Sequence, residues 1–126
     1  MTTKSIVGSR TRRTAYWLTT AALLTETAVG AQWDLSRNDY IRDVLGRLGY
    51  PEYFATIMGA AKVAAVATLV TPGTPRLKEW AYAGLIFVYG GAAASHFAIK
   101  DAKSTVAPLT FFAAGLGSWA LRPSKA

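Results

Sequence analysis

The sequence contains no cysteine and only one histidine, His96. The absence of cysteine excludes a disulfide scaffold, dithiol redox chemistry and a thiolate metal site built by this chain alone. No glycine-rich phosphate loop and no serine–histidine nucleophile arrangement is present. The sequence therefore identifies no catalytic residue and does not decide whether the protein is an enzyme.

A metal site is not expected either, because with one histidine it would have to be built largely from carboxylates. The acidic residues outside the apolar part of the chain are expected to be solvated in loops on one side of the protein. These residues are Asp34, Asp39, Asp43, Glu52 and Asp101.

Charged residues are also scarce, at 17% of the 126 residues, whereas hydrophobic residues make up 52%. This composition excludes a disordered or fibrous chain and is unusual for a small soluble domain. The apolar residues fall in four blocks, at 15–33, 53–71, 80–99 and 106–121. Each block is long enough, or nearly so, to cross about 30 Å of hydrocarbon as a helix. The sequence therefore predicts a single all-α integral membrane domain over 1–126, a bundle of four transmembrane helices.

The net charge of +7 comes from basic residues beside the apolar blocks, where lipid headgroups explain them better than nucleic acid. Eight lysines and arginines belong to the two tails and the loop between the second and third blocks: Lys4, Arg10, Arg12, Arg13, Arg76, Lys78, Arg122 and Lys125. The other side has five: Arg37, Arg42, Arg47, Lys100 and Lys103. The positive-inside rule then predicts that both termini are cytoplasmic.

A cleaved signal peptide is the alternative interpretation of the first block. Arg12 and Arg13 form a basic start, and residues 29–31 (Val-Gly-Ala) resemble a small-residue cleavage site. The length of the block, about 19 residues, and the presence of Glu26 within it favour a retained helix instead.

A short amphipathic helix is predicted between the first two blocks. Its apolar residues recur at helical spacing, as Ile41, Val44, Leu45 and Leu48. Either Ser36 or Asn38 can cap its start, and Gly49 can end it. Two interpretations stay open: a helix lying on the outer membrane surface as a cover over the bundle, or a solvated loop helix packed on the extramembrane ends.

The last apolar block is the shortest, with about 16 residues. Pro108 is expected in its first turn, where the missing N–H costs little. Small residues recur four apart in the blocks, as in Ala113 and Gly117, which favours close helix packing.

Three ionisable residues, Glu26, Lys62 and His96, interrupt the first three apolar blocks. At about 1.5 Å per helical residue, all three lie in the outer half of the membrane. A charge in mid-membrane costs about 2.5 to 3.5 kcal/mol, so a partner is required. We therefore predict an ion pair between Glu26 and Lys62, with His96 nearer the mouth of the bundle and Tyr89 below it.

Two interpretations of this polar cluster remain. The ion pair can simply fix which helices pack together and in which register. Alternatively, the cluster lines an internal pocket for a ligand, a quinone or a proton, since buried ionisable groups in membranes mark such sites. His96 suits a proton relay, but it can equally hydrogen-bond a headgroup or Tyr89.

Four sequence motifs together resemble the DoxX-like family of small bacterial membrane proteins with four helices. They are residues 48–51 (Leu-Gly-Tyr-Pro), 59–62 (Gly-Ala-Ala-Lys), 75–84 (Pro-Arg-Leu-Lys-Glu-Trp-Ala-Tyr-Ala-Gly) and 91–96 (Gly-Ala-Ala-Ala-Ser-His). The resemblance covers about residues 15–121 and implies that Lys62, Ser95 and His96 form the polar signature of the family. The family pattern usually has Gly-Asp shortly after Ser-His, whereas this chain has Lys100 before Asp101.

The resemblance implies a link to quinone-coupled sulfur oxidation and a place in the bacterial inner membrane. The leading hypothesis is a subunit of a quinone-linked or redox complex, with quinone as the cofactor and a membrane redox partner or a second copy as the protein partner. The expected ligand- or proton-binding residues are Glu26, Lys62, Tyr89, Ser95 and His96. Without cysteine, a metal cluster or a nucleotide motif, electrons would enter through a bound quinone or a partner.

Two alternatives belong to other functional classes. Residues 16–18 (Tyr-Trp-Leu), Glu26 and Gly30 are similar to the first helix of small multidrug resistance transporters, which suggests a small proton-coupled transporter. A non-catalytic membrane assembly or packing factor would need only the interfacial helix and the small-residue faces.

Overall fold

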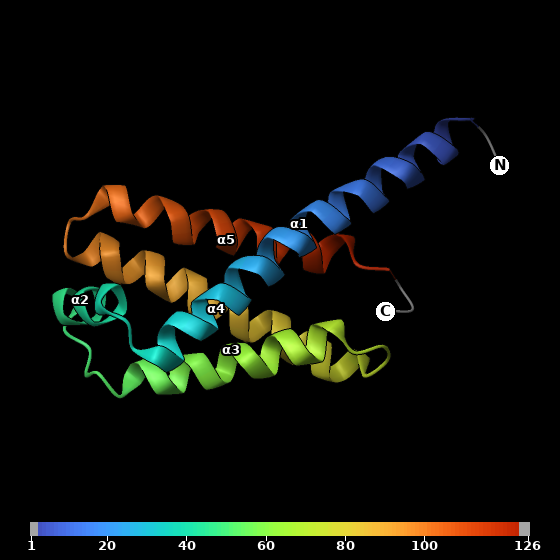
Figure 1. Ribbon diagram of the computed structural model, residues 1–126. Coiled ribbons are helices and arrows are strands. Elements are labelled where there is room, and N and C mark those ends of the chain that lie inside the picture. Colours follow the sequence, from blue (N-terminus) through green and yellow to red (C-terminus); the bar gives the residue numbers. More distant parts are fainter. Residues whose placement is uncertain (1–2, 124–126) are drawn as a thin grey trace.

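Helices are the only regular secondary structure in residues 3–123, which the computed structural model describes, with side chains from Gly8 onward. Its helices are α1 (Thr3–Ser36), α2 (Asp39–Leu48), α3 (Phe54–Val70), α4 (Pro75–Ala98) and α5 (Ala102–Leu121). The long helices α1, α3, α4 and α5 form an up-and-down bundle, and α2 lies at the end opposite the two termini (Figure 1). We call residues 34–54 and 95–104 the α2 end, and residues 8–16, 69–80 and 119–123 the terminal end.

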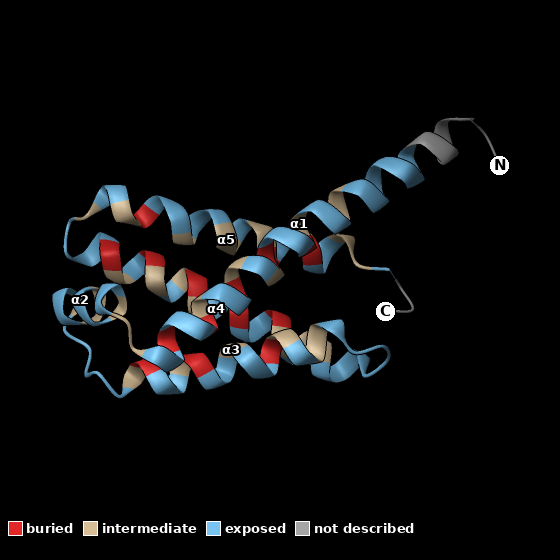
Figure 2. Ribbon diagram, in the orientation of Figure 1, coloured by how far each residue is buried: buried red, intermediate tan, exposed pale blue. Residues whose placement is uncertain are grey.

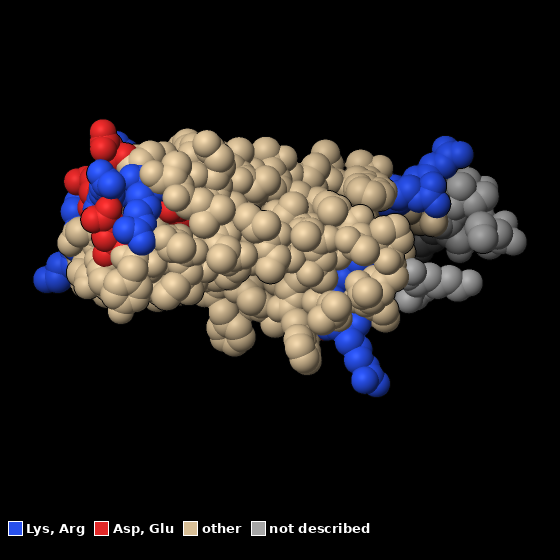
Figure 3. Space-filling view, turned by 60° about the horizontal axis from the view of Figure 1, so that its bottom comes forward, with Lys and Arg blue, Asp and Glu red and all other residues tan. Residues whose placement is uncertain are grey.

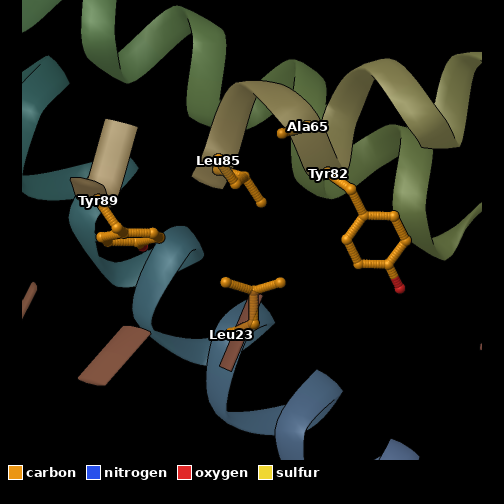
Figure 4. Packing of buried hydrophobic residues seen from close by; sticks show 5 residues of the cluster. All are labelled: Leu23, Ala65, Tyr82, Leu85 and Tyr89. Carbon is orange, nitrogen blue, oxygen red and sulfur yellow. The ribbon is translucent and has the colours of Figure 1, made fainter. Parts of the chain in front are cut away.

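The four long helices pack as a closed ring, in which α1 contacts α3 and α5 while α4 contacts α5 and α3. The core lies where they meet and contains Leu23, Ala65, Tyr82, Leu85 and Tyr89 (Figure 4). Buried positions follow the inner faces of the helices, and much of the outer surface is exposed (Figure 2). Many large apolar side chains lie on that exposed surface, which is what lipid rather than water favours.

Hydroxyl groups join the helices inside the bundle. Ser118 of α5 shares hydrogen bonds with Thr20 of α1 at 2.6 Å and with Tyr82 of α4 at 2.8 Å. Thr27 of α1 shares another with Tyr89 of α4 at 2.8 Å. Such bonds hold helices together where no hydrophobic drive acts between them, as inside a membrane.

The predicted amphipathic helix is confirmed as α2. The side chain of Asn38 accepts a hydrogen bond from the backbone N–H of Ile41 at 2.9 Å, and Gly49 ends the helix in the left-handed region at φ 84°. Asn38 is the cap rather than Ser36 because α1 continues through Ser36. A left-handed C-cap is where glycine is most favourable, so the stop signal in the sequence has a direct physical cause.

The expectation that Pro108 lies in the first turn of the last helix is wrong. The carboxylate of Asp101 accepts a hydrogen bond from the backbone N–H of Ser104 at 3.1 Å, and this cap starts α5 at Ala102. Pro108 is therefore inside the helix, where it leaves a backbone carbonyl one turn earlier without its usual donor. The first turn of α5 is polar, so a prediction based on apolar residues placed the start of the helix too late.

Among the described helices, α5 alone is both long enough and apolar enough to cross a membrane by length and composition, with a mean hydropathy of 1.2. The apolar helix α3 is shorter, with 17 residues. Charged residues nevertheless gather at the two ends of the bundle, and the face between them in Figure 3 shows almost none. Four membrane spans remain a prediction.

Candidate functional site

Lys62 lies at the middle of α3 and points towards α1. Its Nζ lies 2.8 Å from Oδ2 of Asp34, and the two side chains are only 15% and 7% exposed. Gly30, one turn before Asp34, makes room for this contact, because a Cβ there would lie 3.1 Å from Nζ. The ammonium group therefore lies against α1 in a mostly buried ion pair.

The predicted ion pair between Glu26 and Lys62 is wrong, because Lys62 pairs with Asp34 instead. The expectation that Asp34 is a solvated loop residue is wrong for the same reason, since its side chain is buried. Glu26 is half-buried, and within residues 8–123 its carboxylate makes no ion pair within 4 Å.

A cavity of about 380 Å³ opens beside this ion pair, between α2, α3 and α4. The apolar face of α2 forms one wall, and apolar side chains of α3 and α4 form the others; these are Ile41, Val44, Leu45, Leu48, Phe54, Met58, Phe87 and Val88. The polar groups in the lining are Asp34, Tyr50, Lys62, Ser95 and His96. An apolar pocket with a few convergent polar groups is the usual form of a small-molecule site.

His96 contributes the unsatisfied group of this cavity. The residue is 9% exposed, and its Nδ1 is buried without a hydrogen-bond partner. A buried polar atom without a partner costs about 1 to 3 kcal/mol. The imidazole therefore has an unused hydrogen-bonding atom in a residue that lines the cavity.

Tyr50 and Ser95 are joined by a hydrogen bond at the mouth of the cavity. Ser95 donates its hydroxyl proton to the carbonyl of Gly91 at 2.8 Å, so the hydroxyl of Tyr50 donates to Ser95 Oγ, also at 2.8 Å. The ring of Tyr50 stacks on Phe54 with centroids 4.9 Å apart. These contacts hold the segment between α2 and α3 against α4.

Ion pairs on the outside fasten α2 over the cavity. Arg47 reaches Asp101 at the start of α5, with Nη1 and Oδ2 3.2 Å apart, and Arg42 reaches Glu52 at 2.7 Å. The hydrogen bonds from Ser104, and then the charge of Arg47, hold the pKa of Asp101 below its usual value. Asp101 lies outside the cavity and holds α2 over it through the ion pair with Arg47.

Tyr89 does not reach this cavity. It lies in the core, 6% exposed, where its hydroxyl bonds Thr27 and its ring packs beside Phe111. The structure thus brings Lys62, Ser95 and His96 together and leaves Glu26 and Tyr89 outside. Sequence reasoning missed Asp34, although it follows Glu26 and Gly30 at intervals of four on the same helix face.

The model of the DoxX-like family matches residues 18–118, which is most of the chain. The chain belongs to the DoxX-like family. No curated protein and no solved structure matches the chain. Membership identifies a DoxX-like membrane protein and confirms the resemblance found in the sequence motifs.

The turn after Ser95 and His96 has a left-handed position that no glycine occupies. Lys100 adopts the left-handed region at φ 62°, and Asp101 follows it as the cap of α5. A lysine thus occupies backbone geometry that favours glycine, at a cost of about 1 to 2 kcal/mol.

A second hollow continues the cavity of the DoxX-like protein along the seam between α3 and α4. It has a volume of about 330 Å³, and it shares Lys62 and Val88 with the first cavity. Small residues line it, including Ala61, Ala64 and Gly84. The two hollows therefore adjoin at Lys62 and Val88. Over the described part of the chain, no three histidine or acidic residues lie close enough together to hold a metal ion.

Proposed function

We propose that this DoxX-like protein is a membrane subunit that binds a quinone headgroup in the cavity beneath α2 and works with a redox partner. The observation that carries the proposal is that His96, whose buried Nδ1 has no hydrogen-bond partner among the described residues, lines a mainly apolar cavity. A flat ligand with carbonyl oxygens matches apolar walls and a few hydrogen-bond donors. When bound, a quinone supplies reversible electron and proton chemistry.

The residues of the chain have distinct roles in this proposal. Lys62 is positioned by its ion pair with Asp34, and its remaining N–H groups can donate to a ligand oxygen. His96 can hydrogen-bond a second oxygen and exchange a proton there. Tyr50 and α2 form one side of the cavity and would shield a bound ligand from part of the solvent.

The groove between α3 and α4 supports a ligand with a long apolar tail. It shares Lys62 and Val88 with the headgroup cavity, and its lining is mainly apolar. A membrane quinone carries its tail on the same ring as its oxygens, so the shared residues would meet the junction of ring and tail.

The proposed location is the bacterial inner membrane, with α1, α3, α4 and α5 as the spans. The terminal end carries Arg10, Arg12, Arg13, Arg76, Lys78 and Arg122 against the single acid Glu79. By the positive-inside rule, this end is proposed to face the cytoplasm and the α2 end the outside. Of the basic residues counted in the sequence, the side chain of Lys4 and the whole of Lys125 lie outside the described residues.

Binding of quinone analogues to the purified protein in detergent tests the proposal. We expect His96→Ala, and the double variant Asp34→Asn with Lys62→Met, to lower affinity about tenfold or more. Lys100→Ala is the matched control, because Lys100 is at the same end but outside the cavity. Equal affinity in all variants, or no binding to the parent protein, would contradict the proposal.

A variant in the groove separates headgroup from tail. Gly84 lines the groove, and a Cβ there meets nothing within 4 Å. Gly84→Leu is therefore expected to fold and to weaken a long-tailed analogue while leaving an analogue without a tail unchanged. The same loss for both analogues would place the effect on the headgroup and remove the tail from the proposal.

A small proton-coupled transporter is the second candidate, favoured by the observation that Lys62 does not neutralise Glu26 directly. Proton flux into liposomes, lost in Glu26→Gln with quinone binding intact, would support this alternative. A non-catalytic packing factor predicts neither flux nor binding, and the cavity at His96 would then be structural.

A further inference from the structure

A second polar cavity lies at the terminal end, far along the bundle from the first. It has a volume of about 310 Å³, and Tyr16 and Tyr82 form part of its lining. Three helices or their ends supply its charged groups: Arg12 from α1, Lys78 and Glu79 from α4, and Arg122 after α5. Three cationic side chains and one carboxylate thus line the cavity.

The single carboxylate in this cavity is already fully engaged. Oε1 of Glu79 pairs with the guanidinium of Arg122, and its Oε2 accepts a hydrogen bond from Trp119 Nε1 at 2.9 Å. Arg122 also lies over the Trp119 ring, 5.1 Å from its centroid. The charges of Glu79 and Arg122 therefore cancel within the protein.

Arg12 and Lys78 are the two cationic side chains of this lining that Glu79 does not neutralise. Arg12 Nη2 donates to the carbonyl of Ala120 at 3.0 Å, which positions the guanidinium while leaving other N–H groups available. Lys78 has no ion pair or side-chain hydrogen bond among the residues that the structure describes. Two like charges that share one cavity repel each other, and an anion between them would relieve this repulsion.

The depth of the cavity indicates where an anion would come from. Helix α5 has 20 residues, about 30 Å of helix, and it ends at Leu121 beside this cavity. Trp80 and Trp119 lie at the same end, as expected for aromatic residues at a membrane boundary. With α5 as a membrane span, as proposed above, this cavity lies at the level of phospholipid headgroups, whose phosphates are attracted by such basic pockets.

We propose that this cavity binds a phosphate group, with Arg12 and Lys78 as the ligating cations. The guanidinium supplies paired donors to the phosphate oxygens, and the ammonium supplies a point charge. The phosphate belongs to the headgroup of an anionic phospholipid or to a soluble phosphate ligand. The site is independent of the cavity beneath α2, and it would fix an anionic ligand where α1, α4 and α5 meet.

The test uses the full chain in nanodiscs that contain phosphatidylglycerol or only phosphatidylcholine, with retained lipid measured by native mass spectrometry. Lys78→Gln is expected to lower retention of phosphatidylglycerol about fivefold, and Arg12→Gln together with Lys78→Gln by more. Arg76→Gln is the matched control, because it removes a charge from the same end of the same helix but does not line the cavity. It is expected to change retention by less than about twofold. Thermal melting of each variant checks that it is folded.

Competition with inorganic phosphate distinguishes the two sources. Phosphate that displaces the lipid and protects the wild type, but not Lys78→Gln, against thermal unfolding indicates a soluble ligand. Lipid retention that phosphate does not affect indicates a headgroup. The proposal is overturned if neither phosphatidylglycerol nor phosphate binds, or if Arg76→Gln has the same effect as Lys78→Gln, since the effect would then be that of a diffuse basic surface.

Discussion

The α2 end and the terminal end of the bundle handle their charges in different ways. At the α2 end, five basic residues accompany five acidic ones, and each arginine there has a carboxylate partner. At the terminal end, six described basic residues share one acid, Glu79. Figure 3 shows this contrast as mixed colours at one end and basic residues at the other.

The difference indicates that the two ends of a small bundle can serve different functions. The balanced charges of the α2 end close a cover over an apolar cavity, and they need nothing from outside the chain. The excess charge of the terminal end has to be balanced by external anions, which membrane surfaces provide. One end is thus organised to enclose a ligand, the other to meet a charged surface.

The largest contrast between the ends should appear when their ion pairs are broken. Lys62→Met leaves Asp34 buried without a partner and is expected to lower the free energy of unfolding by about 3 to 5 kcal/mol. Glu79→Gln breaks a much more exposed pair with Arg122 and is expected to cost less than about 1 kcal/mol. Unfolding in detergent measures both.

Adding Asp34→Asn to Lys62→Met should recover most of the lost stability, because no buried charge then remains. An equal cost for the two single substitutions, or no recovery in the double variant, would contradict the contrast between a buried and an exposed pair.

Helix packing should differ between the ends by a smaller amount. A Cβ on Gly59 would lie 2.6 Å from Leu35 Cγ and 3.1 Å from the backbone nitrogen of Leu35, whereas one on Gly117 would lie 3.3 Å from Thr19. Gly59→Ala is expected to cost about 1 to 3 kcal/mol, because the backbone of α1 has to move. Gly117→Ala should cost clearly less. Thermal unfolding of both variants, with Gly84→Ala as the unhindered control, decides whether the tight α1–α3 contact is specific to the α2 end.

Backbone strain exists at both ends and is expected to respond to glycine. Thr74 at the terminal end has φ 52°, and Lys100 at the α2 end has φ 62°. Replacement by glycine should stabilise the fold by about 1 kcal/mol at each position, and more at Thr74, because a β-branched residue fits the left-handed region least well. Destabilisation by both substitutions in thermal unfolding would show that these turns carry no strain.

The smallest expected effect concerns pH at the α2 end. The pKa of Asp101 is lowered in the folded protein by the bonds from Ser104 and the charge of Arg47. Its ionised form therefore stabilises the fold above the unfolded pKa of about 3.9, and this stabilisation is lost as the pH falls through the folded value. Wild type should be more stable than Asp101→Asn at neutral pH, and the two should converge on acidification. A stability difference that does not change with pH would contradict this role.

Much of the α2 end could be predicted from local sequence. The spacing of Ile41, Val44, Leu45 and Leu48 gave the face of α2 that lines the cavity, and Gly49 gave its end. Both features depend on interactions within a few residues, so they can be predicted without the rest of the chain. The start of α5 could not be predicted in this way, because its cap Asp101 lies in a polar turn before the apolar run.

Helix periodicity by itself determined which residues of this protein share a face: Glu26, Gly30 and Asp34 on α1, and Gly59 with Lys62 on α3. It could not say which acid meets Lys62, because a shared face leaves the register between two helices free. The tertiary structure decided that question where Gly59 lies against Leu35, since this close contact fixes how far α3 is displaced along α1. Only then does the lysine pair with Asp34 rather than with Glu26.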